Sequence, residues 1–135
     1  MRRSFLAGAA LLAGIVAMGC GAEDHPNDPR PPAGVNLSAT INNHRVIIAP
    51  QEIGAGLATI TLSNQAADDV EVKFIDQTGR RAGATNPIAA GGVGTVQINL
   101  KQGSYELMPD VSTISSGTLT VGTERPSAQN DLLLP

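Results

Sequence analysis

The chain has 135 residues, of which 41% are hydrophobic and only 2% aromatic. It therefore has room for one small domain whose core must be built mainly from aliphatic side chains. Nine Lys and Arg stand against 12 Asp and Glu without a basic run, which argues against nucleic acid as a partner, and the single cysteine excludes an internal disulfide framework and a cysteine-rich zinc module.

Residues 1–19 have the composition of an export signal and not of a folded element. Arg2 and Arg3 form a short positive segment, and residues 5–16 form an apolar core. A core of about a dozen residues is shorter than the about 20 that a transmembrane helix needs. We therefore expect residues 1–19 to be a signal peptide.

The end of this segment reads Ala17-Met18-Gly19-Cys20. Small residues at 17 and 19 followed directly by a cysteine resemble the lipobox of bacterial lipoproteins, although Ala17 stands where that family more often has Leu. The resemblance implies that Cys20 is alkylated by diacylglycerol and becomes the mature N-terminus. The acyl chains would then anchor the protein to the outer face of a bacterial membrane, in the cell envelope or periplasm. An ordinary secretory signal with an incidental cysteine is the alternative.

The first residues, Arg2-Arg3-Ser4-Phe5-Leu6, also resemble the twin-arginine export motif. Gly8 and Gly14 dilute the apolar core, as such signals often show. The twin-arginine route carries proteins that have already folded. Two arginines are also a minimal positive segment of an ordinary signal, so both routes stay open.

Residues 20–34 are predicted to be a tether that begins at the lipidated cysteine. Pro26, Pro29, Pro31 and Pro32 alternate with acidic and small residues, which leaves nothing to bury and favours an extended chain. Removal of the signal peptide takes away two arginines, so the mature protein is more acidic and has no electrostatic attraction to anionic lipids. The anchor alone is expected to hold the membrane.

From residue 35 onward, apolar and polar residues alternate with a period of two. This pattern is typical of strands with one buried and one wet face, and not of helices. The apolar positions are Val35, Leu37, Ala39 and Ile41; Ala58, Ile60 and Leu62; Val70, Val72 and Phe74; Val96, Ile98 and Leu100; Tyr105 and Leu107; and Leu119 and Val121.

Three further segments complete the expected organisation. The run Val46-Ile47-Ile48 suits a strand that is buried on both sides or changes sheets, Gly54-Ala55-Gly56 suggests a turn, and residues 80–90 are expected to form the longest loop. With about seven strands, residues 35–122 are predicted to form an all-β Greek-key β-sandwich. Residues 123–135 would follow it as a C-terminal tail.

The order of these segments resembles the cupredoxins. Residues 50–56 followed by a strand that ends in Asn64 are similar to a turn and strand of that family, and Pro87-Ile88 with Gly91-Gly92 precede a similar strand at 96–100. Residues 103–107 and 117–121 resemble the G-x-Y-x-F and G-x-L-x-V runs that bracket the copper loop, with Leu107 in place of Phe. The resemblance implies a cupredoxin-like fold.

The resemblance also implies where the ligands of type 1 copper would stand, which are two imidazoles, a thiolate and a weak axial thioether. The first His would lie near Val70, the Cys at Pro109, the second His within residues 110–116, and the Met at Ser115 or Ser116. None of these ligands is present. We therefore expect no metal site and no cofactor.

Catalysis is not expected either. A nucleophile needs a base within reach and a group that orients the base. Ser112, Ser115 and Ser116 are available, but His44 is the only histidine of the domain and its spacing does not recommend it. The acidic residues Asp68, Asp69, Glu71 and Asp76 are interpreted as a solvated face and not as a calcium site.

The sequence thus favours a non-catalytic envelope lipoprotein that binds a protein or polymer partner, or supports a complex, through loops 79–92 and 109–116. Arg80, Arg81, Met108 and Asp110 are the candidate contact residues, and Cys20 is the lipid attachment site. The alternative is a weak copper-handling or copper-delivery protein that uses non-standard ligands among His44, Met108 and His25.

Overall fold

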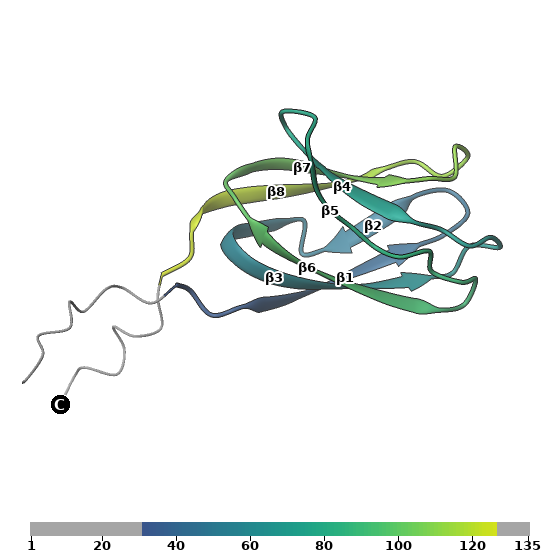
Figure 1. Ribbon diagram of the computed structural model, residues 1–135, viewed down its shortest axis with the longest axis horizontal. Coiled ribbons are helices and arrows are strands. Elements are labelled where there is room, and N and C mark those ends of the chain that lie inside the picture. The colour runs from purple at the N-terminus through teal and green to yellow at the C-terminus, as the bar shows by residue number, and fades with distance from the viewer. Residues whose placement is uncertain (1–30, 127–135) are drawn as a thin grey trace, which may run out of the picture.

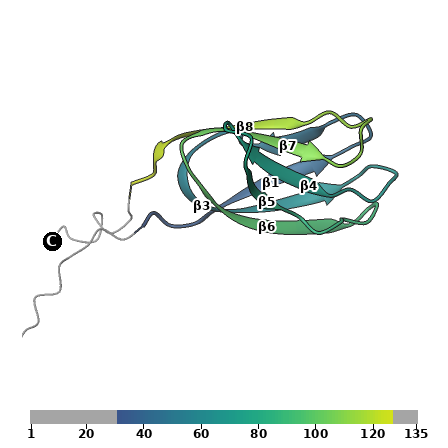
Figure 2. The same ribbon diagram turned by 45° about the horizontal axis from the view of Figure 1, so that its top comes forward.

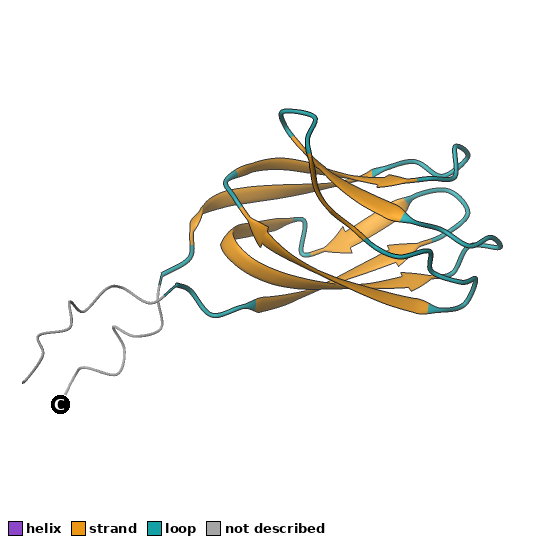
Figure 3. Cartoon of the chain, viewed as in Figure 1, coloured by secondary structure: helices purple, strands orange, loops and turns teal. Residues whose placement is uncertain are grey.

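The computed structural model describes residues 31–126, and these form strands and loops without a helix (Figures 1 and 3). In this part of the chain, no helix is long and apolar enough to cross a membrane. The strands are β1 (Val35–Ile41), β2 (Val46–Ala49), β3 (Glu52–Asn64), β4 (Val72–Asp76), β5 (Arg81–Ala84), β6 (Val93–Leu100), β7 (Gly103–Pro109) and β8 (Gly117–Glu124).

The strands form two layers, as the predicted sandwich requires. One layer has the order β2-β1-β3-β6, and the other has the order β3-β8-β7-β4-β5. The connections after β2, β3, β5 and β6 carry the chain from one layer to the other. Figure 2 shows both layers from a second angle. The all-β sandwich fold is therefore confirmed.

Strand β3 belongs to both layers, and it makes the predicted turn at 54–56 wrong. Its first residues, from Glu52, pair in parallel with β8, and the rest pairs with β1 and β6. The register shifts between Gly54 and Ala55, where the strand passes from one layer to the other. The glycines therefore mark a bend inside a long strand, since glycine accepts the irregular backbone of such a bend.

Strand β2 changes neither layer nor face. Val46 and Ile48 are buried, whereas Ile47 is 42% exposed. The prediction that this run is buried on both sides or changes sheets is thus wrong, because β2 lies at the edge of its layer and pairs only with β1 along its length.

The eighth strand, β5, lies where a loop was expected, so the prediction for 80–90 is wrong at 81–84. Its residues Arg-Ala-Gly-Ala show no apolar alternation and are half-buried or exposed. They form a strand because β4 offers a pairing edge, with a register shift between Phe74 and Ile75. The turn at 77–80 closes the hairpin.

Asp76 organises that turn. Its Oδ1 accepts hydrogen bonds from the Thr78 hydroxyl at 2.6 Å, the Thr78 backbone N–H at 2.8 Å and the Arg80 backbone N–H at 3.0 Å. Gly79 supplies the positive φ of 83° that the turn needs. The Thr78 hydroxyl, followed by the Arg80 N–H, lowers the pKa of Asp76 below its ordinary value.

The core consists of the alternating apolar residues predicted from the sequence. Ile60, Leu62, Val70, Val72, Phe74, Leu107 and Leu119 are 0% exposed, and Ile98 is 5% exposed. Tyr105 is buried with its hydroxyl accepting a 2.9 Å hydrogen bond from the Lys101 backbone N–H. This contact resembles the tyrosine corner of Greek-key sandwiches, in which a buried tyrosine fixes a connection between layers.

Both ends of the described chain lie at one end of the sandwich (Figure 1). Strand β8 continues to Glu124, past residue 122, and Pro32, which the sequence placed in the tether, is buried. Cys20, the predicted signal peptide and most of the predicted C-terminal tail lie outside the described residues.

Candidate functional site

Four connections gather at the end of the sandwich opposite to the termini (Figure 1). They comprise residues 42–45, 65–71, 85–92 and 110–116, and together we name them the loop end. Each connects strands that run toward and then away from this end, so the topology itself brings four distant segments together. Sandwich folds often carry their functional residues on such loops.

Asn64 fixes the base of the loop end. It is 0% exposed, and its Nδ2 donates to the carbonyl oxygens of Asp68 at 2.8 Å and Ile88 at 2.9 Å. Its Oδ1 accepts a hydrogen bond from the Ala66 N–H at 2.9 Å. Both polar atoms of the buried side-chain amide are hydrogen-bonded. The amide therefore joins loops 65–71 and 85–92 without leaving a buried polar atom unpaired.

The loops are also bonded to one another through backbone groups. Asn43 Oδ1 accepts from Ala67, Asp69 Oδ1 accepts from Ala90, and Asp110 Oδ1 accepts from Glu71, at 2.9, 3.2 and 2.9 Å. The Ser115 N–H donates to the His44 carbonyl at 2.8 Å. All four loops are therefore linked, which gives a fixed surface on which four carboxylates, of Asp68, Asp69, Glu71 and Asp110, accompany a single guanidinium, of Arg45.

The places at which the resemblance puts the first His and the Cys of a copper site, Val70 and Pro109, adjoin in the fold, but their side chains cannot bind the metal. Val70 is 0% exposed and bridges Ile88, and Pro109 is buried opposite Val72. The adjoining backbones are bonded, with Asp110 N–H donating to the Glu71 carbonyl at 3.0 Å. Valine and proline side chains offer no donor atom to copper.

His44 and Met108 lie in different places. His44 is exposed in the β1–β2 turn, and its backbone adjoins Ser115 of the β7–β8 connection despite their distance in sequence. Met108, 41% exposed, projects from the outer face of its layer opposite Lys73, because Leu107 and Pro109 on either side point inward. Within residues 31–126, no three His, Cys, Asp or Glu side chains form a group that could hold a metal ion.

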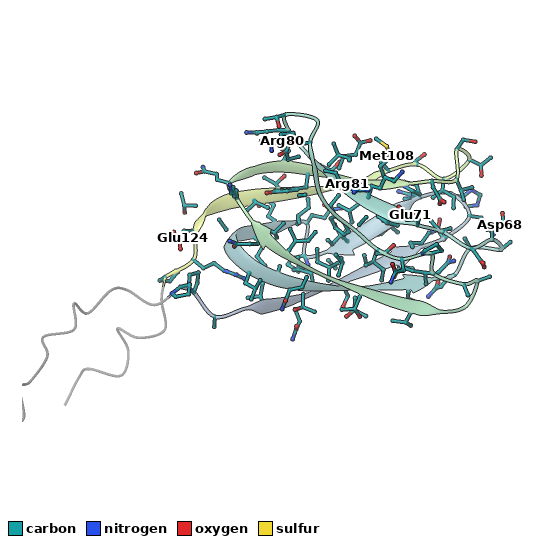
Figure 4. The ribbon with its side chains drawn as sticks, viewed as in Figure 1. Asp68, Glu71, Arg80, Arg81, Met108 and Glu124 are labelled. Carbon is teal, nitrogen blue, oxygen red and sulfur yellow. The ribbon has the colours of Figure 1, made fainter. Side chains whose placement is uncertain are left out.

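The candidate contact residues do not form one surface. Asp110 lies at the loop end, whereas Arg80 lies in the β4–β5 turn and Arg81 begins β5. Figure 4 shows Arg80 well apart from Asp68 of the loop end, with Arg81 and Met108 between them. Of the predicted contact loops, only residues 85–92 and 110–116 share one end. The hydrogen-bonding roles of Asn64, Asn43 and Asp69 were not predicted. The only signal in the sequence was an Asx residue at or within a few residues of a strand end.

No protein-family model and no curated protein matches the sequence. Among solved structures, the chain is similar to auracyanin A, a "blue" copper protein from Chloroflexus aurantiacus, with a TM-score of 0.51 and 12% identity over 67% of this chain and 100% of that one. It is similar to auracyanin B with a TM-score of 0.52 and 15% identity over 69% and 91% of the two chains. These likenesses show the fold, which is cupredoxin-like.

Proposed function

We propose that the protein is a non-catalytic, membrane-anchored envelope lipoprotein whose metal-free cupredoxin-like domain binds a partner at its loop end or supports a complex there. One observation supports the proposal. The four loops of the loop end are hydrogen-bonded to one another, while the buried residues Val70 and Pro109 stand where the resemblance puts two copper ligands. The fold is thus present without copper ligands at these two places, so we assign the function to the surface of the loop end.

The arrangement of the ends supports the anchoring. The described chain begins at the end of the sandwich opposite to the loop end (Figure 1). A lipid on Cys20 would therefore hold the domain by that end and present the loop end away from the bilayer. The partner is an envelope protein or polymer.

Two variants of the intact protein test the two halves of the proposal. Cys20→Ser should move the protein from the membrane fraction to the soluble fraction, because the sulfur is the attachment site. An unchanged membrane fraction would contradict the lipid anchor.

A photo-crosslinking residue at Asp68, on the loop end, should give an adduct in intact envelopes. The same residue at Glu106, exposed on β7, is the control and should give none. Equal adducts at both positions, or no adduct at Asp68, would reject the loop end as the contact surface.

The alternative function is weak copper handling through His44, Met108 or His25. The closeness of the His44 backbone to the β7–β8 connection favours it, whereas Met108 projects elsewhere and His25 lies outside the described residues. An equimolar amount of Cu(II), followed by Cu(I), separates the two. We expect no intense visible band and no large rise in melting temperature, since that band needs a thiolate beside imidazoles. A large rise in melting temperature would favour the alternative. An intense band would contradict both functions, because His44, Met108 and His25 supply no thiolate.

A further inference from the structure

Strand β6 forms one border of the layer β2-β1-β3-β6. It pairs with β3 along its whole length, from Val93 to Leu100, without a register shift, and in the described part of the chain it pairs with no other strand. Figure 2 shows it along the lower border of the sandwich. The side of β6 that faces away from β3 is therefore a long and regular strand edge, which we name the β6 edge.

The backbone groups at the β6 edge belong to alternate residues. The Asn64 N–H donates to the Gly92 carbonyl at 2.9 Å, which fixes the residues of β3 and β6 that exchange hydrogen bonds. Because such pairs alternate along an antiparallel ladder, the even-numbered residues of 94–100 bond to β3. The residues that direct their N–H and C=O groups outward are all exposed, and they are Val93, Thr95, Gln97 and Asn99.

The opposite layer lies beneath β6 and leaves its edge open. A Cβ at Gly94 would lie 2.7 Å from Ile88 Cδ1, and a Cβ at Gly83 of β5 would lie 2.9 Å from Ile98 Cδ1. Both contacts are on the inner face of β6. Val96, which also faces inward, is nevertheless only half-buried, as expected for a residue beside an open edge.

The β6 edge lacks the features by which proteins usually prevent strand pairing, which are charged residues, proline, bulges and short length. None of these occurs in Val93–Leu100. The other two edge strands differ. Backbone hydrogen bonds join Val46 to Ser115 and Gln51 to Thr120, so they close the border at β2, and β5 is short, begins with a charged arginine and pairs with a register shift.

The distribution of charge indicates which partner fits the β6 edge. Strands β1, β2 and β6 contain no charged residue, and β3 contains none after Glu52, so the outer face of this layer is uncharged. The opposite layer carries Lys73 and Glu106, among others. Two copies of a chain with a formal net charge of −3 repel each other least where neither copy carries a charge. A second copy of the chain therefore fits this edge.

We propose that two copies of the chain pair through their β6 edges, antiparallel and about a two-fold axis at Val96. In this register Val96 stands opposite Val96 of the second copy, Thr95 opposite Gln97, and Val93 opposite Asn99. Every outward N–H and C=O of the β6 edge then has a partner, and no like charges stand opposite each other. The uncharged layers of the two copies join into one continuous sheet.

The pairing extends the proposed function without depending on the lipid or on a metal. Because the two β6 strands are antiparallel, the two loop ends point in opposite directions, and a pair can hold two partners. A pair anchored by both lipids would lie with its strands along the bilayer, whereas the single domain presents its loop end away from the bilayer. One strand edge gives a small interface, and attachment to one membrane would favour pairing by raising the effective concentration.

Sedimentation of the full chain carrying Cys20→Ser tests the pairing in solution. We expect its average mass to rise toward twice that of the monomer as the concentration rises to about 1 mM. Adding Thr95→Pro removes an outward N–H from each copy and no β3–β6 hydrogen bond, and an edge strand accepts proline at such a place. It should weaken pairing about tenfold or more, whereas Thr95→Val, the matched control, keeps the N–H and should not.

A disulfide tests the register without the proline variant. In the same Cys20→Ser chain, Val96→Cys should form an intermolecular disulfide under mild oxidation, because opposite residues of such a pair have Cα atoms about 4.5 Å apart, within the range of a disulfide. Thr61→Cys is the control. It lies on the outer face of β3 and is more exposed than Val96, so random collisions would favour it, yet it should stay monomeric.

A photo-crosslinking residue at Gln97 of the lipidated chain tests the pairing in intact envelopes. The expected adduct has twice the mass of the chain, and an adduct with a different protein alone would assign the β6 edge to that partner and overturn the proposal. A chain that stays monomeric at about 1 mM, equal pairing of Thr95→Pro and Thr95→Val, or equal disulfide formation at Val96→Cys and Thr61→Cys would overturn it as well.

Discussion

The side chain of Arg125 donates a 2.7 Å hydrogen bond from its Nη2 to the carbonyl oxygen of Leu57. This bond connects the residue after β8 to the middle of β3. The Arg125 backbone N–H also donates to the Ala55 carbonyl at 3.1 Å. The arginine therefore lies along β3 where that strand passes between the layers.

Two glycines of β3 make room for the Arg125 side chain, and Pro32 lies beside the second of them. A Cβ at Gly54 would lie 2.6 Å from Arg125 Cγ, and one at Gly56 would lie 2.5 Å from Nη2 and 3.0 Å from Pro32 Cγ. The segment that enters the domain and the segment that leaves it are thus packed on the same stretch of β3. The contact fixes where the first and last described segments leave the domain.

Gly56→Ala should destabilise the domain by about 1–3 kcal/mol, because it combines a steric clash with a positive φ of 135°. Gly91→Ala is the control for backbone strain alone, since Gly91 has a φ of 77° and no atom within 4 Å. Gly122→Ala is the baseline variant, because it introduces neither a clash nor backbone strain: its added Cβ would lie 3.9 Å from the nearest atom. Urea unfolding of the three variants measures this. Equal losses of unfolding free energy for Gly56→Ala and Gly91→Ala would show that the close contact with Arg125 contributes nothing to stability.

Ile60→Ala or Ile98→Ala should cost about 2–5 kcal/mol, the range for truncating a buried aliphatic side chain. Thr59→Ala and Gln97→Ala, on the opposite faces of the same strands, should cost little, since both side chains reach solvent. Denaturant melts of the four variants test the phase of both strands. Similar losses on the two faces would contradict the burial pattern.

Asn64→Leu should cost about 1–3 kcal/mol, because it removes the amide donor from the Asp68 and Ile88 carbonyls and leaves the buried Ala66 N–H without its acceptor. The Ile88 carbonyl keeps only the Val70 N–H as a donor. Amide exchange at Ala66, which loses its acceptor, should rise. Asn43→Ala removes a single exposed bond to Ala67 and is the milder control. If the two substitutions cost the same, Asn64 does not organise the loop end.

The pH dependence of stability should contain a contribution from Asp76. Its pKa is lower in the folded state than the ordinary value of 3.8, so the stabilisation is present above the unfolded pKa and is lost as the pH falls through the folded one. Between neutral pH and about pH 2.5, the melting temperature of Asp76→Ala should therefore fall less than that of the native chain. Asp68→Ala serves as the control, and an equal fall for native and Asp76→Ala proteins would exclude the effect.

The alternation of apolar residues was enough to predict the sandwich and most of its core. Ile60, Ile98 and Leu107 are buried as expected, because the inward or outward direction of a strand side chain follows from its position along the strand. The Asn at the end of β3 and the glycines near β7 and β8 also suggested the cupredoxin-like order. Which residues stand where the resemblance puts copper ligands is read from the sequence alone, and Val70 and Pro109 are neither histidine nor cysteine.

What the sequence could not show depends on which segments become neighbours. Arg81–Ala84 has no apolar pattern and is a strand only because β4 stands beside it. Gly54 and Gly56 have the sequence pattern of a turn, but in the fold they make room for Arg125. The role of Asn64 depends on the Ile88 carbonyl, which another loop contributes. The Val46 N–H donates to the Ser115 carbonyl and the Thr120 N–H to the Gln51 carbonyl, so segments about 70 residues apart in sequence become neighbours. Periodicity is a local property of the chain, whereas hydrogen-bond pairing and close approach join residues far apart in sequence, so only the tertiary structure decided them.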